Sequence, residues 1–346
     1  MRAIIASAWH SKARLYEVLK PGSKAPREIR PTTNSSGSTG YQSLASTNAG
    51  EDALFHVRHE ASGRIIFGVD PSLFSRRILR NIYERVTATG LTEREQCDPM
   101  SLLKHAYSRL VEEGEPEYGS STVTFASIDP ATGTLDTLQL GDSGLMIFSA
   151  RDAQITQEPD EQVHGFNHPF QLTALPRAEL QRHGLELDQP EHARIARYQL
   201  RPNDLVLIAT DGLFDNVPAA VLQHVVQDCL SVAAATEQGS VAPSKAGNGG
   251  GGGTSETTDA NPGTAEMVIT RHQADRVEMN SLVKAAGDIT TLATLYSLDP
   301  KAKTPFSQRA KQAGRNFKGG KIDDVTAILF WWQPSMYANA VPNAKL

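Results

Sequence analysis

The stretch "DLVLIATDG", residues 204–212, is an apolar run of strand-forming residues that leads directly into an acidic residue. Side chains alternate between the two faces of a strand, so Asp211 shares its face with Leu207 and Ala209. The carboxylate is therefore expected on an apolar face at the exit of the strand. A buried carboxylate without a partner is costly, which predicts a compensating group beside it.

Three more acidic residues show the same pattern at the ends of predicted strands. Asp142 continues the alternation of "TLQL", Asp323 that of "VTAIL", and Glu51 that of "ALFHV". We expect all of these carboxylates to point at apolar faces, with no Lys or Arg patterned beside them. A divalent cation would compensate their charge, and oxygen ligands without His or Cys suit Mg²⁺ or Mn²⁺. For each acid alone, a turn residue or a helix N-cap is the alternative.

Composition narrows the classes of protein to consider. The chain has 346 residues, a net charge of −5, 39% hydrophobic residues and two cysteines, which fits a globular protein with a substantial core. No dense run of Lys and Arg is present, so we expect no nucleic-acid partner. Two cysteines are too few for a disulfide framework. No segment reaches the roughly 18 to 20 apolar residues that span a membrane.

Strand-like and helix-like segments alternate along the chain. The strands come in hairpin-like pairs, as in "TFASIDPATGTLDTLQL", which favours antiparallel sheets with helices outside them. We predict helices over residues 71–89, 98–113, 217–235 and 266–296. Residues 237–266 are rich in Gly, Ser and Thr and predict a flexible insertion.

The N-terminal region differs from the rest of the chain in its composition. Its first acid is Glu17, whereas Arg2, Lys12 and Arg14 are basic, as in an amphipathic organelle-import segment. A plain surface helix and a mispredicted start are the alternatives. Residues 21–50 are rich in Pro, Ser, Thr and Gly and predict a disordered linker. We therefore expect an N-terminal arm (1–49), one domain (50–334) and a C-terminal tail (335–346).

A series of short motifs follows one order through this domain. They are "GED" (50–52), "GVDPSLFS" (68–75), "GSSTV" (119–123), "LGDSG" (140–144), "DEQVHGFNHPFQL" (160–172), "ATDGLFDNV" (209–217), "PFSQRA" (305–310) and "GGKIDDVT" (319–326). "GDSG" or "DG" alone would be a weak signal. Together the motifs resemble the metal-dependent serine/threonine protein phosphatases of type 2C, the PPM family, and especially their mitochondrial branch.

The resemblance implies an α+β fold, an α-β-β-α sandwich of two antiparallel sheets flanked by helices, with metals at one end of the sheets. By position, Asp211 and Asp323 resemble ligands of a first metal, Glu51 a ligand of a second, and Asp142 part of a further metal position. The residues that resemble the surrounding groups, which hold waters and ligands in place, are Asp52, Asp215, Asp324 and Gly212.

The resemblance also implies a reaction. Two or more Mg²⁺ or Mn²⁺ ions per chain would activate a water for attack on a phosphoserine or phosphothreonine ester. The expected partner is a phosphoprotein substrate. We further expect a monomer and a mitochondrial location, with the cytoplasm as the alternative.

One stretch departs from the family pattern. The family carries an Asp-Gly-x-Gly-Gly turn that supplies a metal-bridging Asp, and this turn is missing near Gly68. Asp70 follows Val69 directly, so strand alternation points it away from the site. We expect Asp70 to be the N-cap of the next helix, with Pro71 at the first helical position, and metal ligation by Asp70 is the alternative. The missing turn leaves a catalytically impaired pseudophosphatase that binds phosphoproteins as an alternative function.

Overall fold

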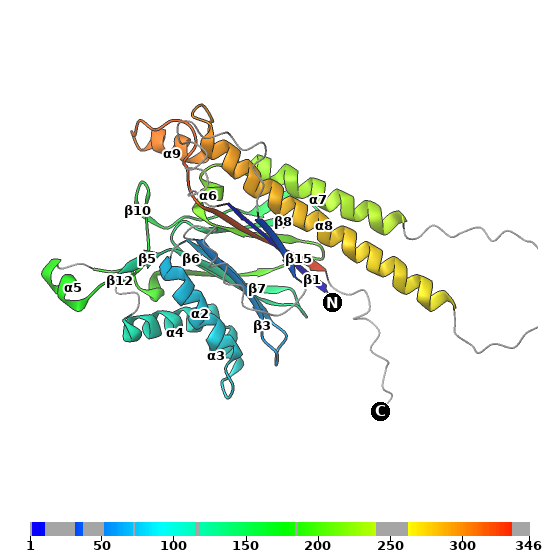
Figure 1. Ribbon diagram of the computed structural model, residues 1–346, viewed down its shortest axis with the longest axis horizontal. Coiled ribbons are helices and arrows are strands. Elements are labelled where there is room, and N and C mark those ends of the chain that lie inside the picture. Colours follow the sequence, from blue (N-terminus) through cyan, green and yellow to red (C-terminus); the bar gives the residue numbers. More distant parts are fainter. Residues whose placement is uncertain are drawn as a thin grey trace, which may run out of the picture.

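The computed structural model of the chain describes residues 2–10, 32–36, 52–71, 73–114, 118–183, 186–239 and 262–333. Two antiparallel sheets are stacked on each other, and helices cover the outer face of each sheet (Figure 1). This arrangement confirms the predicted α+β fold, an α-β-β-α sandwich.

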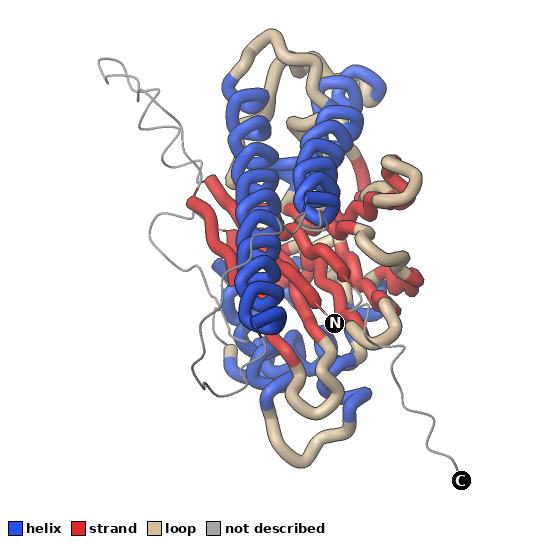
Figure 2. Tube along the Cα trace, turned by 90° about the vertical axis from the view of Figure 1, so that its right-hand side faces the viewer, coloured by secondary structure: helices blue, strands red, loops and turns tan. Residues whose placement is uncertain are grey.

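The first sheet has the strand order β2-β1-β15-β14-β8-β9. Two long helices, α7 and α8, lie side by side across its outer face (Figure 2). The bounds of these elements are β1 (Arg2–His10), β2 (Thr32–Ser36), β8 (Gly144–Ser149), β9 (Gln154–Gln157), β14 (Leu205–Ala209), β15 (Val325–Gln333), α7 (Ala219–Gly239) and α8 (Pro262–Leu298).

The second sheet has the strand order β13-β7-β6-β4-β3. Helices α2 and α4 pack on its outer face, and the short α3 joins them. The bounds are β3 (Asp52–Arg58), β4 (Ile65–Pro71), β6 (Val123–Asp129), β7 (Thr134–Leu140), β13 (Arg194–Gln199), α2 (Leu73–Thr87), α3 (Glu93–Cys97) and α4 (Pro99–Glu113).

Shorter elements connect and cap the two sheets. They are β5 (Gly119–Ser121) with β12 (Leu172–Ala174), the hairpin of β10 (Val163–Gly165) and β11 (His168–Pro169), α5 (Arg177–His183), the 3₁₀ turn η1 (Pro190–His192), α6 (Asp211–Phe214) and α9 (Pro305–Gln312). Among the described residues, no helix is both long and apolar enough to cross a membrane.

Three apolar layers hold the sandwich together. The middle layer lies between the sheets, where Phe67 of β4 stacks on Phe330 of β15 with ring centroids 4.9 Å apart. The two outer layers lie between each sheet and its helices. Strands such as β14 and β15 are therefore buried on both faces. Burial on both faces explains why their sequences are almost continuously apolar.

The N-terminal strand differs from the expected arm. Residues 2–10 form β1, which pairs along its whole length with β15, and β2 pairs with β1 in turn. Ile5, Ala6 and Ala8 are buried in the apolar layers. The first described residues therefore belong to the folded domain and are not a helix. Residues 11–31 and 37–51 lie outside the described residues.

The predicted helices are confirmed as α2, α4, α7 and α8, with small shifts at their ends. Helix α7 continues to Gly239 and α8 starts at Pro262, so both helices extend into the predicted insertion. Residues 240–261 lie outside the described residues.

The N-cap prediction for Asp70 is wrong. Strand β4 continues through Pro71, and Asp70 pairs in register with Ala53 of β3. Helix α2 begins only at Leu73. Sheet pairing with β3 thus extends the strand past the Asp-Pro step that local helix-start rules take as a boundary.

Candidate functional site

The predicted site residues come together at one end of the sandwich, on the loops that leave or enter the strands. Asp211 opens α6 directly after β14, Asp142 follows β7, and Asp323 precedes β15. Asp52 is the first residue of β3. Glu51 lies outside the described residues.

Lys321 is the cation at the centre of this cluster. Its Nζ lies 2.6 Å from Oδ2 of Asp211, 2.6 Å from Oδ2 of Asp215 and 3.4 Å from Oδ2 of Asp323. Burial lowers the pKa of Lys321, but the three carboxylates outweigh it and raise that pKa above its usual value. The expectation that no Lys or Arg accompanies the acids was wrong. The signal was present in "GGKIDD", where Lys321 stands two residues before Asp323.

Arg309 of α9 is a second cation that sequence reasoning missed. Its guanidinium pairs with Asp215 and, at 3.3 Å, with Oε1 of Glu161. Burial raises the pKa of Asp215 to about 6, although Lys321 and Arg309 act in the opposite direction. Burial also raises the pKa of Glu161, which joins the cluster from the loop ahead of β10. The motifs "PFSQRA" and "DEQ" contain both residues, but nothing in their spacing indicated that they meet.

Asp52 is among the most deeply buried carboxyl groups of the site. Only 3% of its surface is exposed, and it accepts a hydrogen bond from Thr210 Oγ1 at 3.1 Å. Burial raises its pKa, and the nearby carboxylates of Asp324, Asp211 and Asp323 raise it further. Asp52 and Asp324, which were predicted to surround the metal ligands, are therefore close to the predicted ligands Asp211 and Asp323.

Asp142 lies on the connection from β7 of the second sheet to β8 of the first sheet. Burial and the carboxylates of Asp211 and Asp215 raise its pKa to about 8. Burial and the neighbouring carboxylates therefore favour the protonated form of Asp142 in the protein without metal. Any cation added to the site would reverse this effect, since positive charge favours the ionised carboxylate.

The backbone around Asp211 is held by close packing. A Cβ atom on Gly212 would lie 1.9 Å from the carbonyl oxygen of Asp324, so only glycine allows α6 to approach the loop before β15. Asn216 donates hydrogen bonds from Nδ2 to the carbonyl oxygens of Gly212 and Lys321, at 2.9 and 2.8 Å. These contacts fix Asp211 and Asp323 on facing segments.

The donor set fits a divalent cation by charge and by chemistry. Carboxyl groups outnumber the cations Lys321 and Arg309, and every donor is a hard oxygen, which suits Mg²⁺ or Mn²⁺. Among the described residues, however, no three acidic, His or Cys side chains are already arranged as a metal-ligand set. Lys321 stands between the acids in this arrangement. A metal would therefore bind Asp211 and Asp323 only after the ammonium group withdraws.

The structure shows a short connection where the family pattern has the glycine turn. Strand β4 ends at Pro71 and α2 begins at Leu73, so no additional loop is inserted near the acidic cluster at this point. In β4, position 70 is on the same side of the strand as position 66, and the side chain of Ile66 packs in the layer under α2 and α4. The opposite side of β4, which includes Val69, faces the other sheet.

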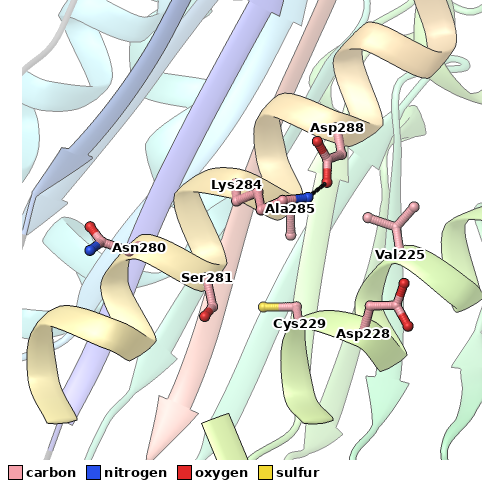
Figure 3. A pocket seen from close by; sticks show the side chains of 8 residues that line it. All are labelled: Val225, Asp228, Cys229, Asn280, Ser281, Lys284, Ala285 and Asp288. Carbon is pink, nitrogen blue, oxygen red and sulfur yellow. Dashed lines mark hydrogen bonds and ion pairs between the residues drawn. The ribbon is translucent and has the colours of Figure 1, made fainter. Parts of the chain in front are cut away.

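A separate hollow lies between α7 and α8 and contains none of the predicted site residues (Figure 3). Cys229 and Ser281 line it, and Lys284 pairs with Asp288 across one helical turn at 2.5 Å. Burial raises the pKa of the Cys229 thiol to about 12, so the thiolate nucleophile is scarce at neutral pH. This hollow lacks the charge arrangement of the carboxylate cluster.

Comparison with known proteins identifies the family of the chain. A family model described as Stage II sporulation protein E (SpoIIE) matches residues 71–244. The human "Protein phosphatase PTC7 homolog" is 30% identical over 292 residues, which cover 81% of this chain and 78% of the human protein. The Drosophila grimshawi "Protein phosphatase PTC7 homolog fig" is 31% identical over 276 residues, covering 79% and 72% of the two chains.

A solved structure supports the fold. The photosystem II phosphatase PBCP superposes with a TM-score of 0.56 and 20% sequence identity, and the match covers 95% of this chain and 98% of that one. The relatives and the sandwich fold together confirm the family indicated by the motifs. The chain therefore belongs to the PPM, or type 2C, family of protein phosphatases, which are hydrolases.

Proposed function

We propose that this phosphatase hydrolyses phosphoserine and phosphothreonine esters of phosphoproteins with the help of Mg²⁺ or Mn²⁺ ions. The observation that carries the proposal is the convergence of Asp211, Asp215 and Asp323 on one cation, Lys321. Carboxylates that gather around a single positive charge offer a binding position for a metal once that charge moves away.

Each part of the site has a role in this proposal. Asp211 and Asp323, with Glu51 and Asp142, would hold the metal ions. Asp215 and Arg309 would fix α6 and α9 beside them, since they pair across the site. When bound, such ions activate water and neutralise the phosphoryl oxygens.

The metal requirement is testable with the full chain. We expect phosphate release from a phosphothreonine peptide with Mn²⁺ or Mg²⁺, and none above background in EDTA. Asp211→Asn should reduce the rate at least 10-fold, because a ligand is lost. Asp152→Asn is the matched control, since Asp152 is an exposed turn residue after β8. Equal rates with metal and with EDTA would refute the proposal.

A pseudophosphatase is the second candidate, and one observation favours it. The chain passes from β4 to α2 without the glycine turn that would carry a bridging carboxylate. This candidate predicts saturable binding of the phosphothreonine peptide without phosphate release at any concentration of Mn²⁺. The same preparation therefore discriminates between the two functions.

A further inference from the structure

The connection from α8 to β15 has a charge opposite to that of the rest of the molecule. Residues 300–320 contain no Asp or Glu, whereas the whole chain has a net charge of −5. We call these residues the cationic segment. Its basic members are Lys301, Lys303, Arg309, Lys311, Arg315 and Lys318.

The cationic segment is anchored at both ends. Thr304 donates from Oγ1 to the carbonyl oxygen of Gly319 at 3.0 Å, and the amide of Gly320 donates to the carbonyl oxygen of Asp299 at 3.0 Å. Gly319 has a φ of +84°, and a Cβ atom there would lie 2.6 Å from Pro300. The loop therefore closes on itself at the end of α8, which gives its cations a defined framework.

The cationic segment borders the carboxylate cluster. The amide of Phe306 donates to the carbonyl oxygen of Asp215 at 2.9 Å, and Lys321 Nζ lies 5.1 Å from the centre of the Phe306 ring. Arg309 reaches into the cluster itself. Figure 1 shows α9 at the same end of the sandwich as α6, which begins with Asp211.

The other cations of the segment face solvent. Lys311, Arg315 and Lys318 are exposed, as are Lys301 and Lys303, and no ion pair joins any of them to another described residue. An apolar group accompanies them. Phe317 is 36% exposed and packs edge-on against Phe306, with ring centroids 4.8 Å apart. The surface beside the site thus offers unpaired positive charge next to an aromatic ring.

We propose that the cationic segment binds acidic residues that flank the phosphorylated residue of the substrate. This inference rests on the proposed function. Unpaired cations at the border of the site attract carboxylates on either side of a phosphorylated residue and thereby orient the peptide. The occupant is an acidic phosphopeptide, because the cations lie next to the site where its phosphate must enter. Helix α9 spans only Pro305–Gln312 and offers little apolar face to a membrane.

The test compares phosphothreonine peptides that differ only in their flanks, Glu in one and Gln in the other. We expect wild-type protein to prefer the Glu peptide in kcat/KM, and more strongly at low salt. The variant Lys311→Gln/Arg315→Gln/Lys318→Gln should reduce that preference about tenfold, since several exposed pairs are lost together. Fluorescence anisotropy of the labelled peptides gives the same ratio from binding.

A matched variant separates docking from net charge. Arg58→Gln/Arg151→Gln/Arg182→Gln removes the same charge from exposed positions. Arg58 is the last residue of β3 and Arg151 lies in the turn after β8, and both strands begin beside the site. This control should keep the wild-type preference. Equal losses in both variants, or no loss in either, would overturn the proposal. So would binding of vesicles with anionic lipid through Lys311, Arg315 and Lys318 without any peptide preference.

A separate measurement on the same protein tests the proposed function. Hydrolysis of p-nitrophenyl phosphate by wild-type protein reports catalysis without a peptide flank. If this hydrolysis is absent, the proposed function fails, and the anisotropy ratio still decides whether the cationic segment recognises acidic flanks.

Discussion

Replacing Lys321 with Met should destabilise the protein without metal. The ammonium group lies within 3.4 Å of three carboxylates and its side chain is 19% exposed. At an effective dielectric constant of about 20, one contact at 2.6 Å corresponds to about 6 kcal/mol of attraction, much of which offsets the desolvation of the charges. Removing one partner of a buried pair costs about 3–5 kcal/mol, and partial exposure favours the lower figure. A loss of about 3 kcal/mol lowers Tm by about 4 °C in a chain of this size.

The same substitution should strengthen metal binding. In the wild-type protein a metal must displace the ammonium group from Asp211 and Asp323. Lys321→Met removes that competition, so its Kd for Mn²⁺ should be lower, by up to about 100-fold for about 3 kcal/mol. Addition of Mn²⁺ should then raise Tm more in the variant than in the wild type. Differential scanning calorimetry in EDTA and in Mn²⁺, with isothermal titration calorimetry, measures both effects.

Lys303→Met is the matched control, because Lys303 is exposed and forms no ion pair with the described residues. Its Tm and Kd should equal those of the wild type. A Lys321→Met protein with unchanged Tm in EDTA, or with weaker Mn²⁺ binding, would refute the view that Lys321 and the metal share one position. Weaker binding in particular would mean that Lys321 supports the metal ligands instead of competing for them.

Two further substitutions test the site. Gly212→Ala should lower the free energy of unfolding by about 1–3 kcal/mol, because its Cβ would lie 1.9 Å from the carbonyl oxygen of Asp324. Gly165→Ala is the control, since a Cβ there meets no atom within 4 Å. Urea unfolding midpoints compare the two variants, and equal midpoints would show that close packing at Gly212 does not determine the loss of stability. Asp142 has a folded-state pKa raised to about 8, so between about pH 4 and 8 the folded protein holds a proton that the unfolded chain has released. The stability of the metal-free protein should therefore fall as the pH rises through this range and level off above it. Asp142→Asn should flatten that slope in a pH series of Tm values, and an unchanged slope would assign it to other groups.

The spacing of apolar residues predicted the layers of the fold better than it predicted where the acidic side chains point. The apolar runs around Leu207 and Ala327 identified β14 and β15, and the hairpin pattern gave antiparallel sheets. Each of these strands is buried on both faces, so alternation could not distinguish the helix side from the side between the sheets. Asp211 and Asp323 meet because the loops after β14 and before β15 converge, not because they share one apolar face.

The missed features depend on pairings that are distant in sequence. Strand β1 contains small residues such as Ala6 and Ala8 and forms a strand because β15 lies beside it. Asp70 stays in β4 because β3 pairs with it. Lys321 could have been suspected from its place before Asp323, but its contact with Asp215 depends on tertiary structure. The motifs carried the family information that the local patterns lacked.

The position of β15 determines when the molecule can be completed during its synthesis. This strand lies between β1 and β14, and its residues are among the last that the structure describes. A ribosome must therefore release residues 325–333 before the first sheet can close, which is a slow, long-range step. Asp211 and Asp215 emerge much earlier and stay in water until the segment with Lys321 arrives. Neutralisation of Asp211 and Asp215 by Lys321 and closure of the sheet by β15 therefore depend on the same late segment of the chain.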